Sequence, residues 1–449
     1  MEPARRGHLL WTLMGSACVG GPMSVTTGSS ASSTSAETEA STSSGATSEA
    51  STTSPATSTS EGTSETVGTA TSDATTSATG PESTSESTSE STSEASTGGP
   101  PSTCGPPCAE TWEHFGDLVV DDAPADYACL TWVHGDLYLR KEADPAAVET
   151  LANLERVDGT LTIHGPAGLT ELGAFSCLSA VDSLWLSGLD QLSDLSGLGG
   201  LQEANDVFLI ELPIVALPTF AADYVGIRSL TLNSNLALAD LSAASTWSVA
   251  GSSLTVKIHW SPALTDLSGL AGLIEGVGDG SLWVQLDDLS GLTSLAGLEA
   301  ATHGSFTFYS LPELVDLAPL ANLQSVGSLD LVDLPKVTSL AGLHNLESAD
   351  WMMIGDCVNM GTGGMNGLTS LAGLESLQSV GSLALANNMN LTSLDGAPLL
   401  TSASEGVNAV NNPMLTPAAY MAFLDQFTPT PENCHGGWDE CPCFQILPW

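Results

Sequence analysis

Twelve short apolar segments recur along the last two-thirds of the chain. Most are triplets in which a variable residue stands between two apolar ones, and the segments at Trp351 and Val407 are quartets. Because side chains alternate between the two faces of a strand, such triplets predict short β-strands that are buried on one face. The first residues of the segments, mostly 23 or 24 positions apart, are Leu137, Leu161, Leu184, Val207, Leu230, Leu254, Leu282, Phe306, Leu329, Trp351, Leu383 and Val407.

The sequence between these segments repeats as well. Groups such as LSGL, LAGL and LAPL follow many of the segments about eleven residues later, and residues 321–343 match residues 375–397 at 12 of 23 positions. One repeat has too few apolar residues to close a core, but stacked repeats align their leucines beside a parallel sheet. We therefore predict a mainly β fold, a parallel solenoid of about 12 coils of 23–24 residues.

The repeat also resembles a known family. The pattern L-x-x-V-G-S-L-x-L-x-x-x-x-L-T-S-L-x-G-L extends over residues 129–427 and is clearest within residues 295–397. It is similar to the receptor L-domain, a leucine-rich, right-handed parallel β-helix of growth-factor receptor ectodomains and fungal cell-wall proteins. The resemblance implies an extracellular ligand-binding or structural module without catalysis. It transfers no ligand-contact residue to this chain.

The composition divides the chain into further segments. Residues 19–103 are nearly all Ser, Thr, Ala, Gly, Glu and Pro and include no aromatic or basic residue. Such a segment buries too little apolar surface to offset its ordering entropy, which predicts a disordered linker. It is either a plain spacer or an O-glycosylated stalk. We expect an N-terminal cap over residues 104–135, the solenoid over residues 136–427, and a cysteine-rich C-terminal cap over residues 428–449.

The N-terminus has the layout of an export signal over residues 1–18. Arg5 and Arg6 precede a short apolar run, and small residues precede Cys18. The sequence GSAC resembles the lipobox of bacterial lipoproteins, although Gly15 stands where that family usually has leucine. We therefore expect lipidation at Cys18 and location at a bacterial outer membrane or cell surface, with the lipid as the only membrane contact. Secretion after cleavage nearby is the alternative.

The remaining cysteines predict disulfides. Eight are left once Cys18 is assigned to lipid, an even number suited to an exported protein. The CHGGWDECPC segment at the C-terminal end also suggests zinc, but its spacing is not that of a zinc finger, and a disulfide cap is the preferred interpretation. The pairing stays open among Cys104, Cys108, Cys129, Cys177, Cys357, Cys434, Cys441 and Cys443.

Charge and motifs argue against several functions. The chain carries 52 acidic and 8 basic residues, so nucleic acid is a poor partner. None of the histidines forms a metal-binding spacing, and nucleophile-elbow, phosphate-loop and dinucleotide motifs are missing from the sequence. We expect no enzyme activity, no cofactor and no metal. A β-helix enzyme that degrades polysaccharides is the catalytic alternative.

A column of acidic and hydroxyl residues precedes the LSGL-like groups. Its side chains are expected to bind backbone amides at a repeated turn. The alternative is a ladder of calcium sites, although a Gly-Asp-rich ion loop is missing from the sequence. The members are Asp194, Asp240, Asp266, Asp316, Ser294, Ser339, Ser370 and Ser393.

The candidate binding surface is the outward face of the strands. The middle residues of the triplets should form one row that includes Thr231, Thr255, Trp283 and Thr307, and residues two positions later should form a second row. Exposed aromatics there indicate recognition or adhesion, with an extracellular protein or glycan as partner. Simple stacking of neighbouring rings and a structural envelope protein are the alternatives. The candidate residues are Tyr138, Arg140, His164, Trp185, Phe208, Lys257, Trp283 and Tyr309.

Overall fold

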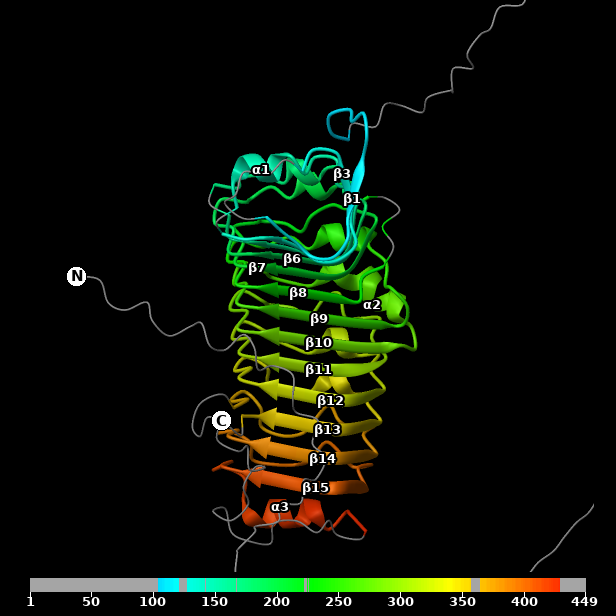
Figure 1. Cartoon of the computed structure of the whole chain (residues 1–449). Helices are drawn as coiled ribbons and strands as arrows, with labels where there is room; N and C mark the ends of the chain where they lie inside the picture. The colour runs from blue at the N-terminus through cyan, green and yellow to red at the C-terminus, as the bar shows by residue number, and fades with distance from the viewer. Residues whose placement is uncertain are drawn as a thin grey trace, which may run out of the picture. The chain divides into compact units, whose positions relative to one another are not determined.

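One parallel β-sheet dominates the described part of the chain (Figure 1). The computed structural model describes residues 104–120, 127–141, 143–166, 168–221, 224, 226–356 and 364–428. Within these ranges the sheet has 15 strands, and its paired strands run parallel. The strands are β1 (Trp112–His114), β2 (Leu118–Val120), β3 (Leu130–Val133), β4 (Leu137–Leu139), β5 (Arg156–His164), β6 (Ala180–Ser187), β7 (Glu203–Ile210), β8 (Ser229–Asn233), β9 (Ser253–His259), β10 (Ser281–Asp287), β11 (His303–Tyr309), β12 (Ser325–Val332), β13 (Ser348–Gly355), β14 (Ser379–Ala386) and β15 (Ser402–Val410).

The predicted mainly β, parallel stack is confirmed. All twelve apolar segments lie in strands β4 to β15, and neighbouring coils in sequence are neighbours in the sheet. In β12, Leu329 and Leu331 are fully buried while Asp330 between them points away from the core. The segment expected to be only a cap adds β1, β2 and β3 to the same sheet, and Val119 of β2 lies beside Tyr138 of β4.

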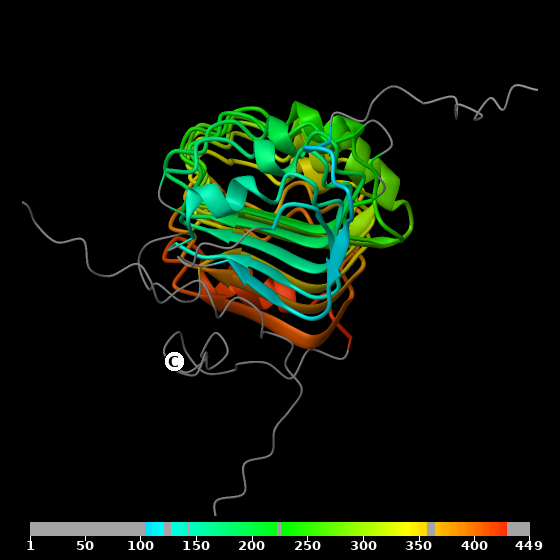
Figure 2. The same cartoon turned by 45° about the horizontal axis from the view of Figure 1, so that its top comes forward.

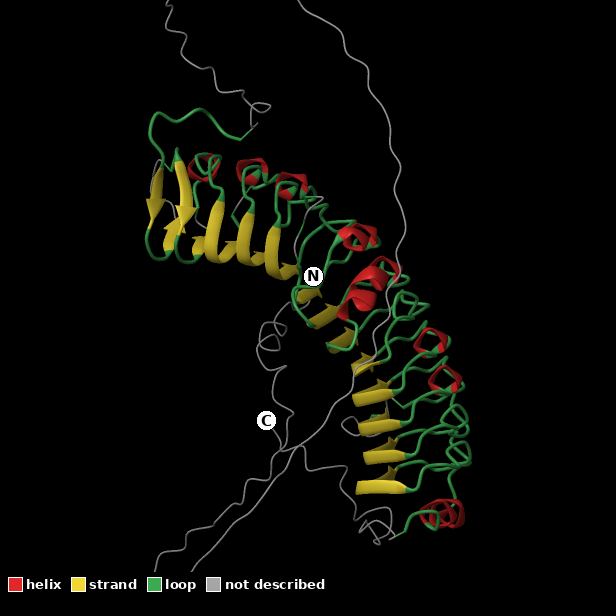
Figure 3. Cartoon of the chain, turned by 90° about the vertical axis from the view of Figure 1, so that its right-hand side faces the viewer, coloured by secondary structure: helices red, strands yellow, loops and turns green. Residues whose placement is uncertain are grey.

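The side opposite the sheet consists of short helical turns (Figure 2). The stack curves so that the strands line its inner side and the helices its outer side (Figure 3). A fully buried leucine closes most of the turns, so the core lies between turns and sheet. The elements are α1 (Pro145–Glu149), α2 (Ala271–Val277), α3 (Pro417–Leu424), η1 (Gly173–Phe175), η2 (Ser196–Leu198), η3 (Ser242–Thr246), η4 (Ser268–Leu270), η5 (Ala318–Leu320) and η6 (Ala341–Leu343), where η marks a 3-10 turn.

The acidic and hydroxyl column acts as predicted at these turns. Asp194 Oδ1 accepts a hydrogen bond from the Ser196 amide at 2.8 Å, and the other seven residues accept from the amide two positions on at 2.7–3.3 Å. The backbone hydrogen bond from Ser196 lowers the pKa of Asp194. The column therefore satisfies a free amide in each of the turns that its eight residues precede.

Two further columns of residues stabilise the chain directly after the C-terminal ends of the strands. The residue after each strand from β7 to β12 has positive φ, as at Glu211 (54°) and Asp333 (54°), and after β7 to β11 its amide extends the ladder to the next coil. One position later, a buried asparagine replaces leucine in several coils. Asn388 Nδ2 donates to Ile354 O at 2.9 Å, and its Oδ1 accepts from the Met365 amide at 3.0 Å. These asparagines satisfy buried backbone groups in the coil before them.

Both ends of the core are covered. At the C-terminal end α3 packs against β15, and Tyr420 donates to Val407 O at 2.7 Å. At the N-terminal end a disulfide joins Cys108 to Cys129, which confirms two of the disulfide candidates. Cys104 and Cys177 are free thiols.

Several expectations fall on other parts of the chain. The linker, the C-terminal cap with its zinc alternative, Cys18, Cys357, Cys434, Cys441 and Cys443 lie outside the described residues. Among the residues that are described, none of the helices is long and apolar enough to cross a bilayer.

Candidate recognition face

The outward side of strands β4 to β11, here called the strand face, carries the candidate residues. It faces the inside of the curve (Figure 3). Tyr138, Trp185 and Phe208 share one row, because Tyr138 and Trp185 both lie beside Thr162 and Trp185 lies beside Phe208. This part of the predicted row is confirmed, and Val119 of β2 extends it at the N-terminal end.

The predicted rows are wrong at β9 and β10 and correct again at β11, where Thr307 pairs with Gln285, the neighbour of Lys257. Thr231 pairs with Lys257 rather than with Thr255, so Lys257 continues the row of Trp185. Trp283 pairs with Thr255 on one side and with Ser305 on the other. It therefore lies two residues closer to the N-terminal ends of the strands than the row of Trp185 and Lys257. The physical reason is that β9 buries Leu254, Val256 and Ile258 equally, so the apolar pattern fits either register.

Each of the two candidate tryptophans has one intramolecular partner. The Trp185 ring stacks on Phe208 with 4.7 Å between ring centroids, as the ring-stacking alternative expected. The ammonium group of Lys257 lies 4.8 Å from the centroid of the Trp283 ring. Both tryptophans nevertheless keep more than a third of their surface exposed, 36% for Trp185 and 37% for Trp283. They are held in place and still reachable by a partner.

Two other candidates, His164 and Tyr138, are held by polar contacts. His164 Nδ1 lies 2.8 Å from Ser187 Oγ, and the Tyr138 hydroxyl donates to Asp136 Oδ2 at 2.7 Å. That hydrogen bond raises the pKa of Tyr138. Burial raises the pKa of Tyr309, which ends β11. Arg140 follows β4 directly, two residues after Tyr138.

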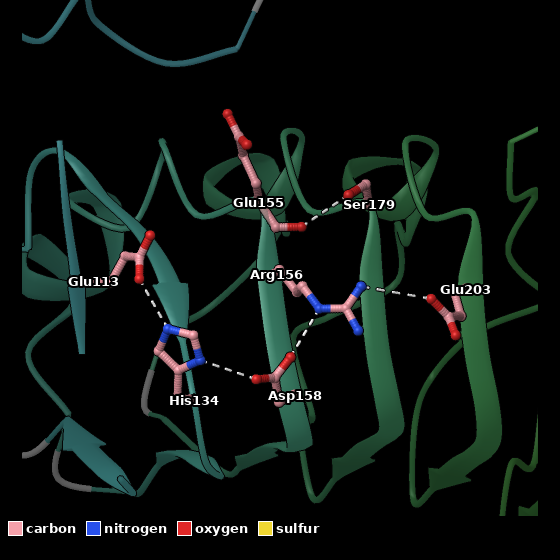
Figure 4. A network of polar contacts seen from close by, with 7 residues as sticks. All are labelled: Glu113, His134, Glu155, Arg156, Asp158, Ser179 and Glu203. Carbon is pink, nitrogen blue, oxygen red and sulfur yellow. Dashed lines mark hydrogen bonds and ion pairs between the residues drawn. The ribbon is translucent and has the colours of Figure 1, made fainter. Parts of the chain in front are cut away.

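A polar network borders the strand face at its N-terminal end (Figure 4). His134 lies between Glu113 Oε2 at 2.9 Å and Asp158 Oδ2 at 3.1 Å, and the hydrogen bond that it donates to Glu113 raises its pKa. Arg156 continues the network to Asp158 at 2.8 Å and to Glu203 at 3.7 Å. The sequence analysis did not identify this group, although His134 and Asp158 are one coil length apart.

Aromatic rings enclose the histidine of this network. Phe115 stacks on His134 with 4.4 Å between ring centroids, and Trp132 stacks on it at the same distance. Arg156 lies 5.5 Å from the centroid of the Trp132 ring. Phe115 is 78% exposed and Trp112, three residues earlier in the chain, is 39% exposed, so apolar surface continues past the end of the strand face.

Stacking and hydrogen bonding are the interactions that the strand face offers. Its groups are aromatic rings, hydroxyls and a few charges, all carried by paired strands. Within the described residues, no three side chains of His, Cys, Asp or Glu are grouped to hold a metal ion.

Comparison with known proteins adds no family to this picture: no protein-family model and no curated protein matches the chain. The resemblance to the receptor L-domain therefore stays a prediction that depends on the repeat residues.

Proposed function

We propose that the protein is a cell-surface recognition or adhesion protein without catalytic activity, which binds an extracellular protein or glycan through the strand face. The observation that carries the proposal is the exposure of Trp185 and Trp283 on a paired sheet whose inner rows are fully buried. Large aromatic side chains that are already ordered lose little entropy when a partner covers them.

The electrostatics restrict the class of partner. Lys257 already lies over Trp283, and Arg156 and Arg228 are paired with carboxylates. Few cations are thus left to neutralise a polyanion, and the net charge of −44 opposes one. A neutral glycan or a protein with an apolar or basic patch fits the face better than an acidic polymer.

The proposal includes the features that place this face outside the cell. Cys18 would carry the lipid after export, and residues 19–103 would separate the anchor from the folded domain. Support comes from the signal-like N-terminus and from the disulfide between Cys108 and Cys129, which is typical of exported proteins. We further propose a right-handed, L-domain-like stack of about 12 coils of 23–24 residues with a disulfide-bonded C-terminal cap, on the basis of the repeat.

The experiment compares wild type with a Trp185→Ala/Trp283→Ala double variant on glycan arrays and in pull-downs from cell-surface extracts. Loss of central aromatic contacts should weaken binding at least about tenfold. A Val215→Ala/Leu236→Ala variant is the matched control, because these side chains are 64% and 66% exposed but lie outside the strands. Equal binding profiles for the two double variants would remove the strand face as the binding site.

A further inference from the structure

Two free cysteines, Cys104 and Cys177, lie near the N-terminal end of the stack. The Cys177 thiol, buried in the turn before β6, donates to Ala152 O at 2.9 Å. Gly105, the residue after Cys104, comes so close to the same turn that an added Cβ would lie 2.7 Å from Ala152 O. Cys177 and the residue after Cys104 therefore lie against one backbone carbonyl, although 73 positions separate the two cysteines in the sequence.

The segment around Cys104 is held in this place by several contacts. Asn153 Nδ2 donates to Pro106 O at 3.2 Å and lies 3.3 Å from Cys108 Sγ. Cys108 is itself tied to Cys129. Gly105 has a φ of +51°, and an added Cβ would lie 2.2 Å from Asn153 Oδ1, so only glycine allows this approach.

We propose that Cys104 and Cys177 form a second disulfide of the N-terminal end in the oxidised protein. The Cys104 side chain is close enough to Cys177 to act on the ionisation of its thiol. Burial and then the Cys104 side chain raise the pKa of the Cys177 thiol to about 12, so Cys104, which is only half-buried, is the thiol that reacts first.

The oxidant we assign is a disulfide, such as oxidised glutathione or the disulfide of an exchange enzyme. The Cys104 thiolate attacks one sulfur of that disulfide, expels one thiolate and forms a mixed disulfide. The Cys177 thiolate then attacks Cys104 Sγ and expels the second thiolate. The two protein thiols lose two protons and two electrons in total, and the oxidant leaves as two thiols.

This link would join the first described residue of the domain to the coil between β5 and β6. It would close a long loop that contains β1 to β5 and α1, and long loops lose the most chain entropy when they are cross-linked. A pulling force on residues 19–103 would then be transmitted directly to the coil between β5 and β6, and the first coils would not bear it. This arrangement fits a tethered adhesion protein. The pairing itself does not depend on the proposed function.

The test uses the full chain, prepared in reduced form and incubated with oxidised glutathione. Free thiols are blocked with N-ethylmaleimide in denaturant, and the protein is digested at acidic residues without reduction for mass spectrometry. We expect the Cys177 peptide to be unlabelled and linked to the peptide that contains Cys104. The same peptide also contains Cys108, so the Cys129 peptide should be attached to it as well, which shows that the reduced protein has reoxidised.

Variants with one cysteine replaced separate this pairing from others. In Cys104→Ser the Cys177 peptide should become labelled, and in Cys177→Ser one thiol of the Cys104 peptide should become labelled. The Cys108–Cys129 link should remain in both variants, which also reports that the N-terminal end still folds. Labelling of Cys177 in the oxidised wild type, or its linkage to any other cysteine, would overturn the proposal.

Discussion

Replacing the buried Asn388 by leucine should destabilise the stack although leucine fits the position. Leu334 occupies the equivalent place after β12, so the shape is tolerated. Asn388 itself is fully buried and satisfies the carbonyl of Ile354 and the amide of Met365. Leucine removes both partners, and each buried backbone group left unpaired costs about 1–3 kcal/mol. We therefore expect Asn388→Leu to lower the free energy of unfolding by about 2–5 kcal/mol.

Equilibrium urea denaturation, followed by circular dichroism and tryptophan fluorescence, measures this effect. Agreement between the two signals tests for a single transition, which repeat arrays do not always show. Asn390→Ala is the matched control, because its amide donates to Asn366 O at an exposed position and its loss should cost about 0.5 kcal/mol or less. If Asn388→Leu were as stable as the control variant, the asparagine column would not act through its hydrogen bonds.

Three further predictions concern single positions. Glu211→Gly should raise the melting temperature and Glu211→Val should lower it, because φ is +54° there and a Cβ strains this conformation. Gly381→Ala should lower the unfolding free energy by about 1–3 kcal/mol in urea denaturation, since the new Cβ would lie 2.2 Å from Asp350 O; unchanged stability would contradict this close approach. In an NMR titration Glu113→Gln should lower the pKa of His134, which is raised above 6.5 in the folded protein. The stabilisation from this raised pKa is present in full below pH 6.5 and is lost as pH rises through the folded pKa. A free energy of unfolding that showed no contribution from His134 over this pH range would contradict the prediction.

The repeat and its turns were predictable because they depend on local rules. The strand positions follow from alternating apolar residues, and Leu329 and Leu331 are buried as this alternation requires. Asp194 and its equivalents bind the amide two positions on, an interaction that needs no knowledge of the rest of the fold. Exposure of Trp185 on the strand face follows from the same alternation.

The sequence by itself therefore determined the parallel stack, its buried leucines and the side of the sheet that faces solvent. Only the tertiary structure decided the register of β9 and β10 against their neighbours. Three apolar residues of β9 fit the core equally well, so the apolar pattern allows either register of this strand. The packing of whole coils selects the register in which Lys257 lies beside Thr231. The meeting of Cys104 with Cys177 likewise depends on how the first segment folds back over the stack, which no local pattern specifies.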